Sequence, residues 1–150
     1  MIIEGSLIIS VFGNEPVEDA VGEQVYLYSI DENSKLVMSK ATINKVYVEN
    51  YDVVSVDTKG RRGSITCIPE MKVLISNGTD DIEKRVLDLK NGDRIKGIRN
   101  SVITYEIGDK IGDYHTVKKV DSEKYTGYMY ELVLEGSQYY MVNSLIVYVG

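Results

Sequence analysis

The sequence predicts an all-β protein. Val and Ile together supply 35 of the 150 residues (19 Val and 16 Ile) and Tyr supplies 12, whereas Ala occurs twice and Leu nine times. β-branched and aromatic side chains favour the pleated surface of a sheet, whereas Ala and Leu favour helices. Short apolar runs also recur about every ten residues with turn-forming residues between them, which is typical of a fold built from hairpins.

The first part of the chain predicts two strands and one short helical piece. Residues 7–12 are apolar and predict a strand that ends at the turn-forming residues 13–16. Residues 17–20 predict a single helical or 3₁₀ turn. Residues 25–30 alternate around two tyrosines, which predicts a strand because successive side chains point to opposite faces of a sheet. A turn at residues 31–34 follows it.

The middle of the chain predicts further strands separated by glycine-containing turns. Residues 37–48 hold one or two strands, and residues 53–56 form another that ends at the hairpin-like break 59–63. The next apolar stretch, residues 65–75, is interrupted by a proline and ends before Asn77-Gly78, a dipeptide that strongly favours a tight turn.

One segment predicts a helix. Within residues 80–89, Ile82, Val86 and Leu89 fall at helical spacing, and acidic residues open the segment as they do at helix N-termini. The turn-forming residues 91–93 would end it.

The last third returns to strands, and one short pattern occurs twice. Gly22 and Gly92 each begin the order glycine, acid, any residue, apolar residue, and each opens an expected strand. The pattern is compatible both with an internal repeat and with two unrelated turns, because Gly-acid turns are common. The remaining strands are expected at residues 94–98, 102–105, 115–120, 128–134 and 139–149.

Composition excludes several classes of function. The net charge of −6 and the pI of about 4.8 disfavour nucleic-acid binding, because phosphate neutralisation needs clustered Lys and Arg. A single Cys and a single His exclude a disulfide framework, a cysteine zinc cluster and a multi-histidine metal site, so no metal or cofactor is expected. No apolar run approaches the roughly 20 residues that span a bilayer, and the N-terminus lacks a signal-peptide pattern. A cytoplasmic protein without membrane contact is the expectation, and the low Ala content would suit a low-GC genome such as that of a phage.

Several local motifs follow one another in a recognisable order. The opening residues Gly5-Ser6-Leu7-Ile8 and Val17-Glu18-Asp19 precede the first Gly-acid pattern, and later segments hold further motifs. This order resembles that of the hedgehog/intein (Hint) family, at the spacing of a mini-intein without an endonuclease insert. The resemblance implies one domain over residues 1–150, with a horseshoe-like β fold, pseudo-two-fold symmetry and at most one or two short helices. The later segments that carry the resemblance are residues 65–74, 86–95, 130–136 and 140–149.

The departures from the family lie where the family keeps its chemistry. Met1 stands at the position of the Cys or Ser nucleophile, and a thioether cannot attack a carbonyl. Met71 stands at the histidine of the second conserved block, and Gln138 at a histidine of the last blocks. Tyr148 and Val149 replace the terminal His-Asn pair, whose asparagine cyclises in active inteins.

Two milder departures accompany these five. Ile68 stands where the second block has Thr, and Glu131 replaces an Asp. The resemblance therefore implies a degenerate, non-splicing Hint domain that serves as a structural or protein-interaction module with an unidentified protein partner. Whether any enzymatic activity remains is left open.

Two alternatives stay open. The first is residual autoprocessing, by splicing or by C-terminal self-cleavage, with Asn143 and Ser144 as candidate residues because Asn-Ser is a common splice junction in active inteins. Deliberate inactivation of such a site would be a variant of it, although methionine and valine are unusual replacements. The second alternative is an unrelated small β-barrel binding module. The competing interpretation of the Asn-Ser pair is a tight turn between two strands.

Three further features have ordinary structural interpretations beside functional ones. Cys67 lies between apolar residues and is interpreted as a small core residue rather than a nucleophile. His115 is expected at an exposed strand start, with general-base chemistry beside Asp113 or Asp109 as the alternative. The basic residues 59–62 are interpreted as a solvated hairpin tip.

Tyrosines gather in the last third of the chain. Tyrosine is frequent in interface hot spots, and it is also common in cross-strand packing. The sequence predicts a possible interaction surface formed by Tyr125, Tyr128 and Tyr139.

Overall fold

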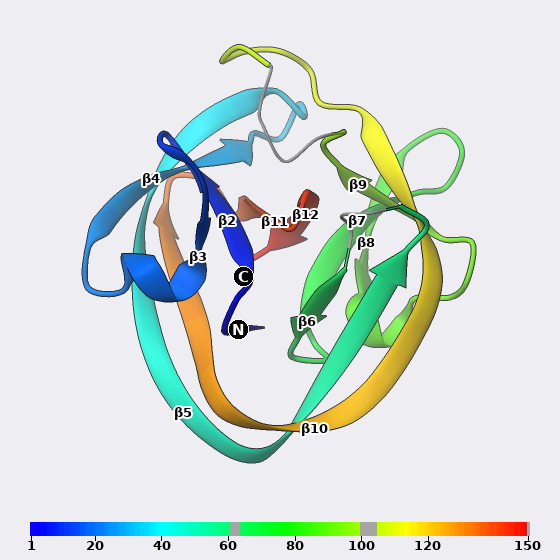
Figure 1. The fold of residues 1–150 in the computed structure, drawn as a ribbon. Helices are drawn as coiled ribbons and strands as arrows, with labels where there is room; N and C mark the ends of the chain where they lie inside the picture. The colour runs from blue at the N-terminus through cyan, green and yellow to red at the C-terminus, as the bar shows by residue number, and fades with distance from the viewer. Residues whose placement is uncertain (61–63, 100–104, 150) are drawn as a thin grey trace.

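Two long antiparallel strands organise the molecule. The computed structural model describes residues 1–60, 64–99 and 105–149. β5 (Leu36–Thr58) and β10 (Asp113–Glu135) each have 23 residues, pair with one another and curve around the other elements (Figure 1). They belong to one 12-stranded sheet.

The other elements are short. The remaining strands are β1 (Ile2–Ile3), β2 (Leu7–Ser10), β3 (Gly13–Pro16), β4 (Gln24–Ile30), β6 (Ile65–Cys67), β7 (Lys72–Ser76), β8 (Asp81–Arg85), β9 (Arg94–Gly97), β11 (Tyr139–Val142) and β12 (Leu145–Tyr148), and the two 3₁₀ turns are η1 (Val17–Ala20) and η2 (Val86–Asp88). The all-β expectation is therefore confirmed. In the described residues, no helix has the length and apolar character needed to cross a membrane.

The order and pairing of the elements repeat once along the chain. The series β2, β3, η1, β4, β5 is followed by β7, β8, η2, β9, β10. The pairings match as well, because β1 pairs with β10 and β6 with β5, while β11 pairs with β2 and β12 with β7. Gly22 and Gly92 occupy equivalent places between the 3₁₀ turn and the next strand, with φ angles of 80° and 98°. The repeated Gly-acid pattern therefore corresponds to the pseudo-two-fold symmetry of the fold.

The expected helix over residues 80–89 is wrong. Its first half is strand β8, in which Ile82 pairs with Ile75 of β7, and its second half is η2. Val86 and Leu89 are buried whereas Ile82 is 43% exposed on the hairpin, so the three residues do not form the single buried face that their helical spacing predicted. The turn expected at Asn77-Gly78 is confirmed, since it joins β7 to β8.

Other boundaries also differ from the expectation. Residues 13–16 are not a turn but strand β3, which pairs with β2. The expected breaks at residues 49–52 and 121–127 do not occur, because β5 and β10 pair through both segments. A register shift beside Gly127 and a left-handed Asn50 accommodate the bend. The last stretch is a hairpin of β11 and β12, which agrees with the interpretation of Asn143-Ser144 as a tight turn.

Part of the prediction falls outside the described residues. Residues 102–104 of the strand expected at 102–105, and Arg61 and Arg62 of the basic tip, are among them. Lys59 itself is exposed at the end of β5.

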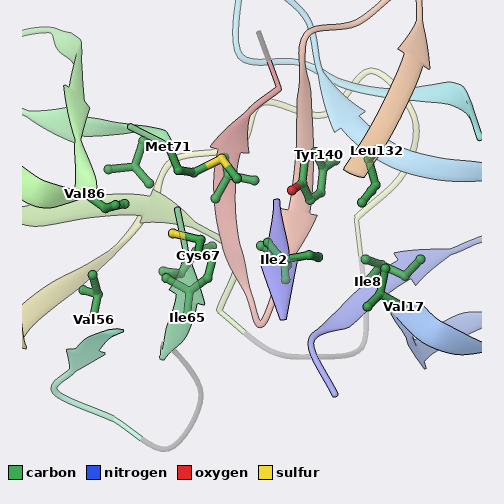
Figure 2. Close-up of a cluster of buried hydrophobic side chains, with 14 of the residues drawn as sticks. Ile2, Ile8, Val17, Val56, Ile65, Cys67, Met71, Val86, Leu132 and Tyr140 are labelled. Carbon is green, nitrogen blue, oxygen red and sulfur yellow. The ribbon is translucent and has the colours of Figure 1, made fainter. Parts of the chain in front are cut away.

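The core fills the interior of the curved sheet. Its main cluster draws apolar side chains from most of the strands, and Figure 2 shows Ile2 of β1 among them. A separate smaller cluster contains Val48, Val53 and Met129, with Met1 and Ile3 packed against it. Along β5, Ala41 and Ile43 face the main cluster and Val48 faces the smaller one, because successive side chains of a strand point to opposite faces.

Candidate functional site

The N-terminal strand lies between the two halves of the fold. Ile2 pairs with Tyr130 of β10 on one side and with Cys67 of β6 on the other. The backbone N–H of Ile68 donates a hydrogen bond to the carbonyl oxygen of Met1 at 3.2 Å. Ile68 packs against both the main and the smaller core cluster. The first residue of the chain is therefore held beside the turn that leads to Met71.

Met71 is part of the core. Its backbone N–H donates to the carbonyl oxygen of Ile68 at 3.1 Å, and its own carbonyl accepts from Val86 at 2.7 Å. The buried thioether projects among apolar side chains of the main cluster (Figure 2). A thioether in this setting cannot donate a proton to a scissile amide, which is what a histidine at this place would do.

The end of the chain returns to the same region. The backbone N–H of Val149 donates to the carbonyl oxygen of Gln138 at 2.7 Å, and the Val149 side chain packs against the main cluster. Tyr148 opposes Tyr139 in the β11–β12 hairpin, with ring centroids 5.3 Å apart. These contacts come from strand pairing and packing.

The term central site is used below for Met1, Met71, Gln138, Tyr148 and Val149. Met1 and Met71 carry thioethers, and Gln138 and Val149 carry an amide and an alkyl group. None of these groups attacks a carbonyl or exchanges a proton near neutral pH. The tyrosine is engaged in ring packing. Hydrogen bonds and packing hold these residues in the core and at its edge, with Met1 bonded to Ile68 and Val149 to Gln138.

The α-amino group of Met1 is partly buried and lies near acidic side chains. Burial lowers the pKa of the Met1 α-amino group, and its interactions with Cys67, Glu131 and Glu70 partly offset that effect. Glu131 is exposed on β10.

The buried thiol lies next to the central site but is not reactive. Burial raises the pKa of Cys67 to about 12. Because the thiolate is the nucleophilic form, Cys67 stays an uncharged core residue near neutral pH. Its interpretation as a small apolar side chain agrees with its complete burial in the main cluster (Figure 2).

Asn143 and Ser144 form the turn between β11 and β12. Both have left-handed backbone angles, with φ of 49° and 69°. The Asn143 Oδ1 accepts a hydrogen bond from the backbone N–H of Leu7, and its Nδ2 donates to the carbonyl of Ser64, each at 2.8 Å. Self-cleavage would need this Nδ2 to attack the asparagine's own backbone carbonyl. The side chain instead ties three segments together, beside a cavity of about 220 Å³ between residues 3–6 and 64–66.

His115 takes no part in the central site. Its Nε2 lies 2.7 Å from the carbonyl oxygen of Ile98, and its ring packs closely against the backbone of Gly97. Asp113 instead accepts a hydrogen bond from Tyr105. The general-base arrangement considered from the sequence therefore does not form through Asp113.

The three tyrosines expected at one surface are divided between two places. Tyr139 is half-buried on β11 and donates to Glu83 at 3.0 Å, whereas the other two tyrosines lie on β10. Tyr125 donates to the carbonyl of Tyr128 at 2.9 Å. The exposed partner of Tyr128 is one that the sequence analysis did not select, Tyr47.

We call Tyr47, Tyr128 and Lys45 the tyrosine patch. Tyr47 and Tyr128 face one another across β5 and β10, with ring centroids 5.4 Å apart, and they are 53% and 40% exposed. The ammonium of Lys45 lies 3.9 Å from the centroid of the Tyr128 ring. Tyr47 is missed from sequence because its partner is 81 positions away; only the strand register brings them together.

A buried polar network is also absent from the sequence analysis. The Lys96 ammonium donates to Asp81 at 2.5 Å and to Ser34 at 2.7 Å, and Tyr114 donates to the same carboxylate at 2.6 Å. Its sequence signal is weak, because Lys96 lies in the short strand β9 beside a second basic residue, Arg94. Within residues 1–60, 64–99 and 105–149, no three His, Cys, Asp or Glu side chains are grouped as metal ligands.

The overall fold matches that of inteins. The TvoVMA intein superposes with a TM-score of 0.79 at 16% identity, covering 97% of this chain and 95% of that one. A DnaB intein from Synechocystis sp. PCC 6803 superposes with a TM-score of 0.75 at 19% identity, over 99% and 97% of the two chains. A bacterial intein-like domain from Clostridium thermocellum gives a TM-score of 0.72 at 13% identity, over 99% and 97%.

These likenesses confirm the Hint-like fold. Comparison of sequences adds no assignment, since the chain matches no protein-family model and no curated protein. At identities this low the structural likeness establishes the fold alone, so activity has to be argued from the side chains of the central site.

Proposed function

We propose that this domain, which has the fold of the inteins, does not splice and instead acts as a protein-binding module. The observation that carries the proposal is the central site, where Met1, Met71 and Val149 have no group that can act as nucleophile, proton donor or cyclising amide. Met71 and Val149 instead pack in the main apolar cluster. Backbone hydrogen bonds fix both Met1, through the Ile68 N–H, and Val149, through the Gln138 carbonyl.

Splicing needs three chemical events that the central site does not support. A nucleophile at the first position must attack the preceding carbonyl, and Met1 has none. A proton must reach the departing amide, and Met71 cannot supply it. A terminal asparagine must cyclise, and Val149 has no amide.

The alternative of cleavage at Asn143 receives no support from its geometry. Its Nδ2 is engaged by the Ser64 carbonyl, and its Oδ1 by the Leu7 N–H. Cyclisation would require both hydrogen bonds to break and the turn to rearrange.

We expect no splicing or cleavage when the domain is expressed between two reporter proteins. Intact-mass spectrometry of the fusion, incubated with and without dithiothreitol or hydroxylamine, should show the full-length mass alone. A second fusion carrying Met1→Cys, Met71→His, Tyr148→His and Val149→Asn serves as the matched control, because it returns the reactive side chains to the same backbone. A ligated product or a discrete cleavage in the wild-type fusion would contradict the proposal, and the cleaved bond would identify the residue responsible.

The binding half of the proposal rests on the tyrosine patch. Exposed aromatic rings with a cation stacked on one of them are typical of interface hot spots. The patch lies on the β5–β10 pair, whose curved course Figure 1 shows. An acidic chain with few clustered cations is better suited to a protein than to a nucleic acid.

We expect replacement of the patch to weaken partner binding at least about tenfold. The double variant Tyr47→Ser with Tyr128→Ser removes both rings, and Tyr26→Ser is the matched control because Tyr26 is 52% exposed on β4. The partner is first identified by chemical cross-linking in cell extract, and its affinity for each purified variant is then measured. Equal affinities for the wild type and the double variant would refute this surface, as would an equal loss in the control.

A further inference from the structure

The chain contains two Asn-Gly pairs that the sequence does not distinguish. These are Asn77-Gly78 in the β7–β8 turn and Asn91-Gly92 before β9. In such a pair the glycine backbone nitrogen can attack the asparagine side-chain carbonyl, because no side chain on the glycine blocks its approach. Gly78 and Gly92 have similar left-handed φ angles of 101° and 98°, and open space surrounds the Cβ position of each.

The two asparagine side chains differ in their hydrogen bonds. Oδ1 of Asn77 accepts three, from the Thr79 N–H at 3.0 Å, the Thr79 hydroxyl at 3.2 Å and the Asp80 N–H at 2.8 Å. Negative charge develops on this oxygen when a nucleophile adds to Cγ. Donors already directed at such an oxygen stabilise the charge as it forms, in the manner of an oxyanion hole.

The attacking nitrogens differ as well. The Gly78 N–H makes a long hydrogen bond of 3.2 Å to the hydroxyl of Ser76, and the turn is exposed. The Gly92 N–H is held at 2.9 Å by the backbone carbonyl of Val117. Asn91 is fixed too, because its Nδ2 donates to the carbonyl of Lys118 at 3.0 Å. Attack at Asn91 would break contacts between β10 and the segment before β9.

We propose that Asn77 is a site of spontaneous succinimide formation and deamidation, and that the fold protects Asn91. The Gly78 nitrogen forms a bond to Cγ of Asn77, the Cγ–Nδ2 bond breaks, and the amide leaves as ammonia with the proton from the Gly78 nitrogen. Water then adds to either carbonyl of the succinimide and yields aspartate or isoaspartate. The chain is not cleaved, and no other reactant is needed.

The modification would act on a turn that sets a strand register. The new carboxylate lies beside Asp80 and Asp81, and isoaspartate lengthens the backbone by one carbon between the paired residues Ser76 and Asp81. Asp81 is the partner of the buried Lys96. Deamidation at this exposed turn would therefore alter the pairing of Asp81 and, through it, the ion pair with Lys96.

The test compares the two pairs in the same protein. The purified chain is aged in mildly alkaline buffer, folded or in concentrated urea, and peptide mapping by mass spectrometry measures the deamidated fraction at each site. In urea we expect similar rates at Asn77 and Asn91; in the folded protein we expect Asn77 to react at least about tenfold faster than Asn91. An equal or faster rate at Asn91 in the folded protein would overturn the proposal, as would an Asn77 that stays intact while the urea sample reacts.

Variants at Thr79 test the role of the donors. Thr79→Val removes the hydroxyl donor and should slow the reaction at Asn77 in the folded protein about twofold to tenfold, the range for one hydrogen bond. Thr79→Ser keeps the hydroxyl and should keep the rate, so it controls for disturbance of the turn. Neither variant should matter in urea. An unchanged rate in folded Thr79→Val, or the same slowing in both variants, would refute stabilisation by these donors.

Discussion

Gly97→Ala is expected to lower the free energy of unfolding by about 3 kcal/mol, because a side chain there has no space. A Cβ at Gly97 would lie 2.2 Å from the backbone carbonyl oxygen of Ser144 and 2.8 Å from Cδ2 of His115. That carbonyl cannot move freely, since it accepts the Ile98 N–H at 2.9 Å and belongs to the left-handed turn between β11 and β12. The clash would separate β9 from the C-terminal hairpin.

Urea unfolding followed by circular dichroism would measure the loss. Gly112→Ala is the matched control, because its Cβ would have no heavy atom within 4 Å and its backbone is not left-handed. That variant should be neutral or gain up to about 1 kcal/mol through the less flexible unfolded chain. A Gly97→Ala protein as stable as Gly112→Ala would show that the close approach of β9 to the Ser144 carbonyl is wrong.

Asp81→Asn is expected to cost about 3 kcal/mol, because it leaves the Lys96 charge without its counter-charge. The Lys96 side chain is 3% exposed and that of Asp81 is 21% exposed. Lys96→Met added to Asp81→Asn should recover much of the loss, since the unpaired charge is then gone. A double-mutant cycle by urea unfolding gives the coupling energy of the pair.

The effect of Asp81→Asn should depend on pH in a defined direction. Burial alone would raise the pKa of the Asp81 carboxyl, but its hydrogen bonds with Lys96 and Tyr114 hold it below the ordinary value. A carboxyl with a lowered pKa stabilises the fold fully above the unfolded-state pKa of about 3.9, and the stabilisation is lost as pH falls through the lower folded value. The difference between wild type and variant should therefore be constant near neutral pH and shrink in acid below about pH 4.

An exposed ion pair serves as the control for this network. The side chains of Lys124 and Asp52 are 58% and 72% exposed. Asp52→Asn should change stability by less than about 1 kcal/mol, because solvent screens exposed pairs. A similar loss in Asp52→Asn and Asp81→Asn would indicate a general charge effect rather than a buried pair.

The order of the motifs along the chain predicted the fold better than the local patterns did. The Gly-acid pattern at Gly22 and Gly92 marks the same step in both halves, and the structure relates them by pseudo-two-fold symmetry. Helical spacing at residues 82–89 predicted the wrong element because three apolar residues at that spacing also occur in a strand followed by a 3₁₀ turn. The domain extent, the cytoplasmic location and the phage-like origin stay predictions.

The candidate site divides in the same way. The proposal that Met1, Met71 and Val149 stand in place of reactive residues comes from the sequence alone, because it depends on which side chain stands at each motif position. How these residues lie relative to one another depends on the tertiary structure, which places β1 between β6 and β10. The tyrosine patch could not be foreseen for the same reason, since its two rings come from strands far apart in the chain.

The sequence by itself determined the all-β class and the order of most strands and turns. These properties are local, because each follows from side-chain type and spacing over a few residues. Only the tertiary structure decided that β5 and β10 run unbroken for 23 residues, that Lys96 is paired inside the domain, and that two identical Asn-Gly pairs differ. Those properties depend on which distant strand supplies the hydrogen-bond partner. The free energy of strand pairing sums contributions from many residues along both strands, so no short segment of the sequence encodes it.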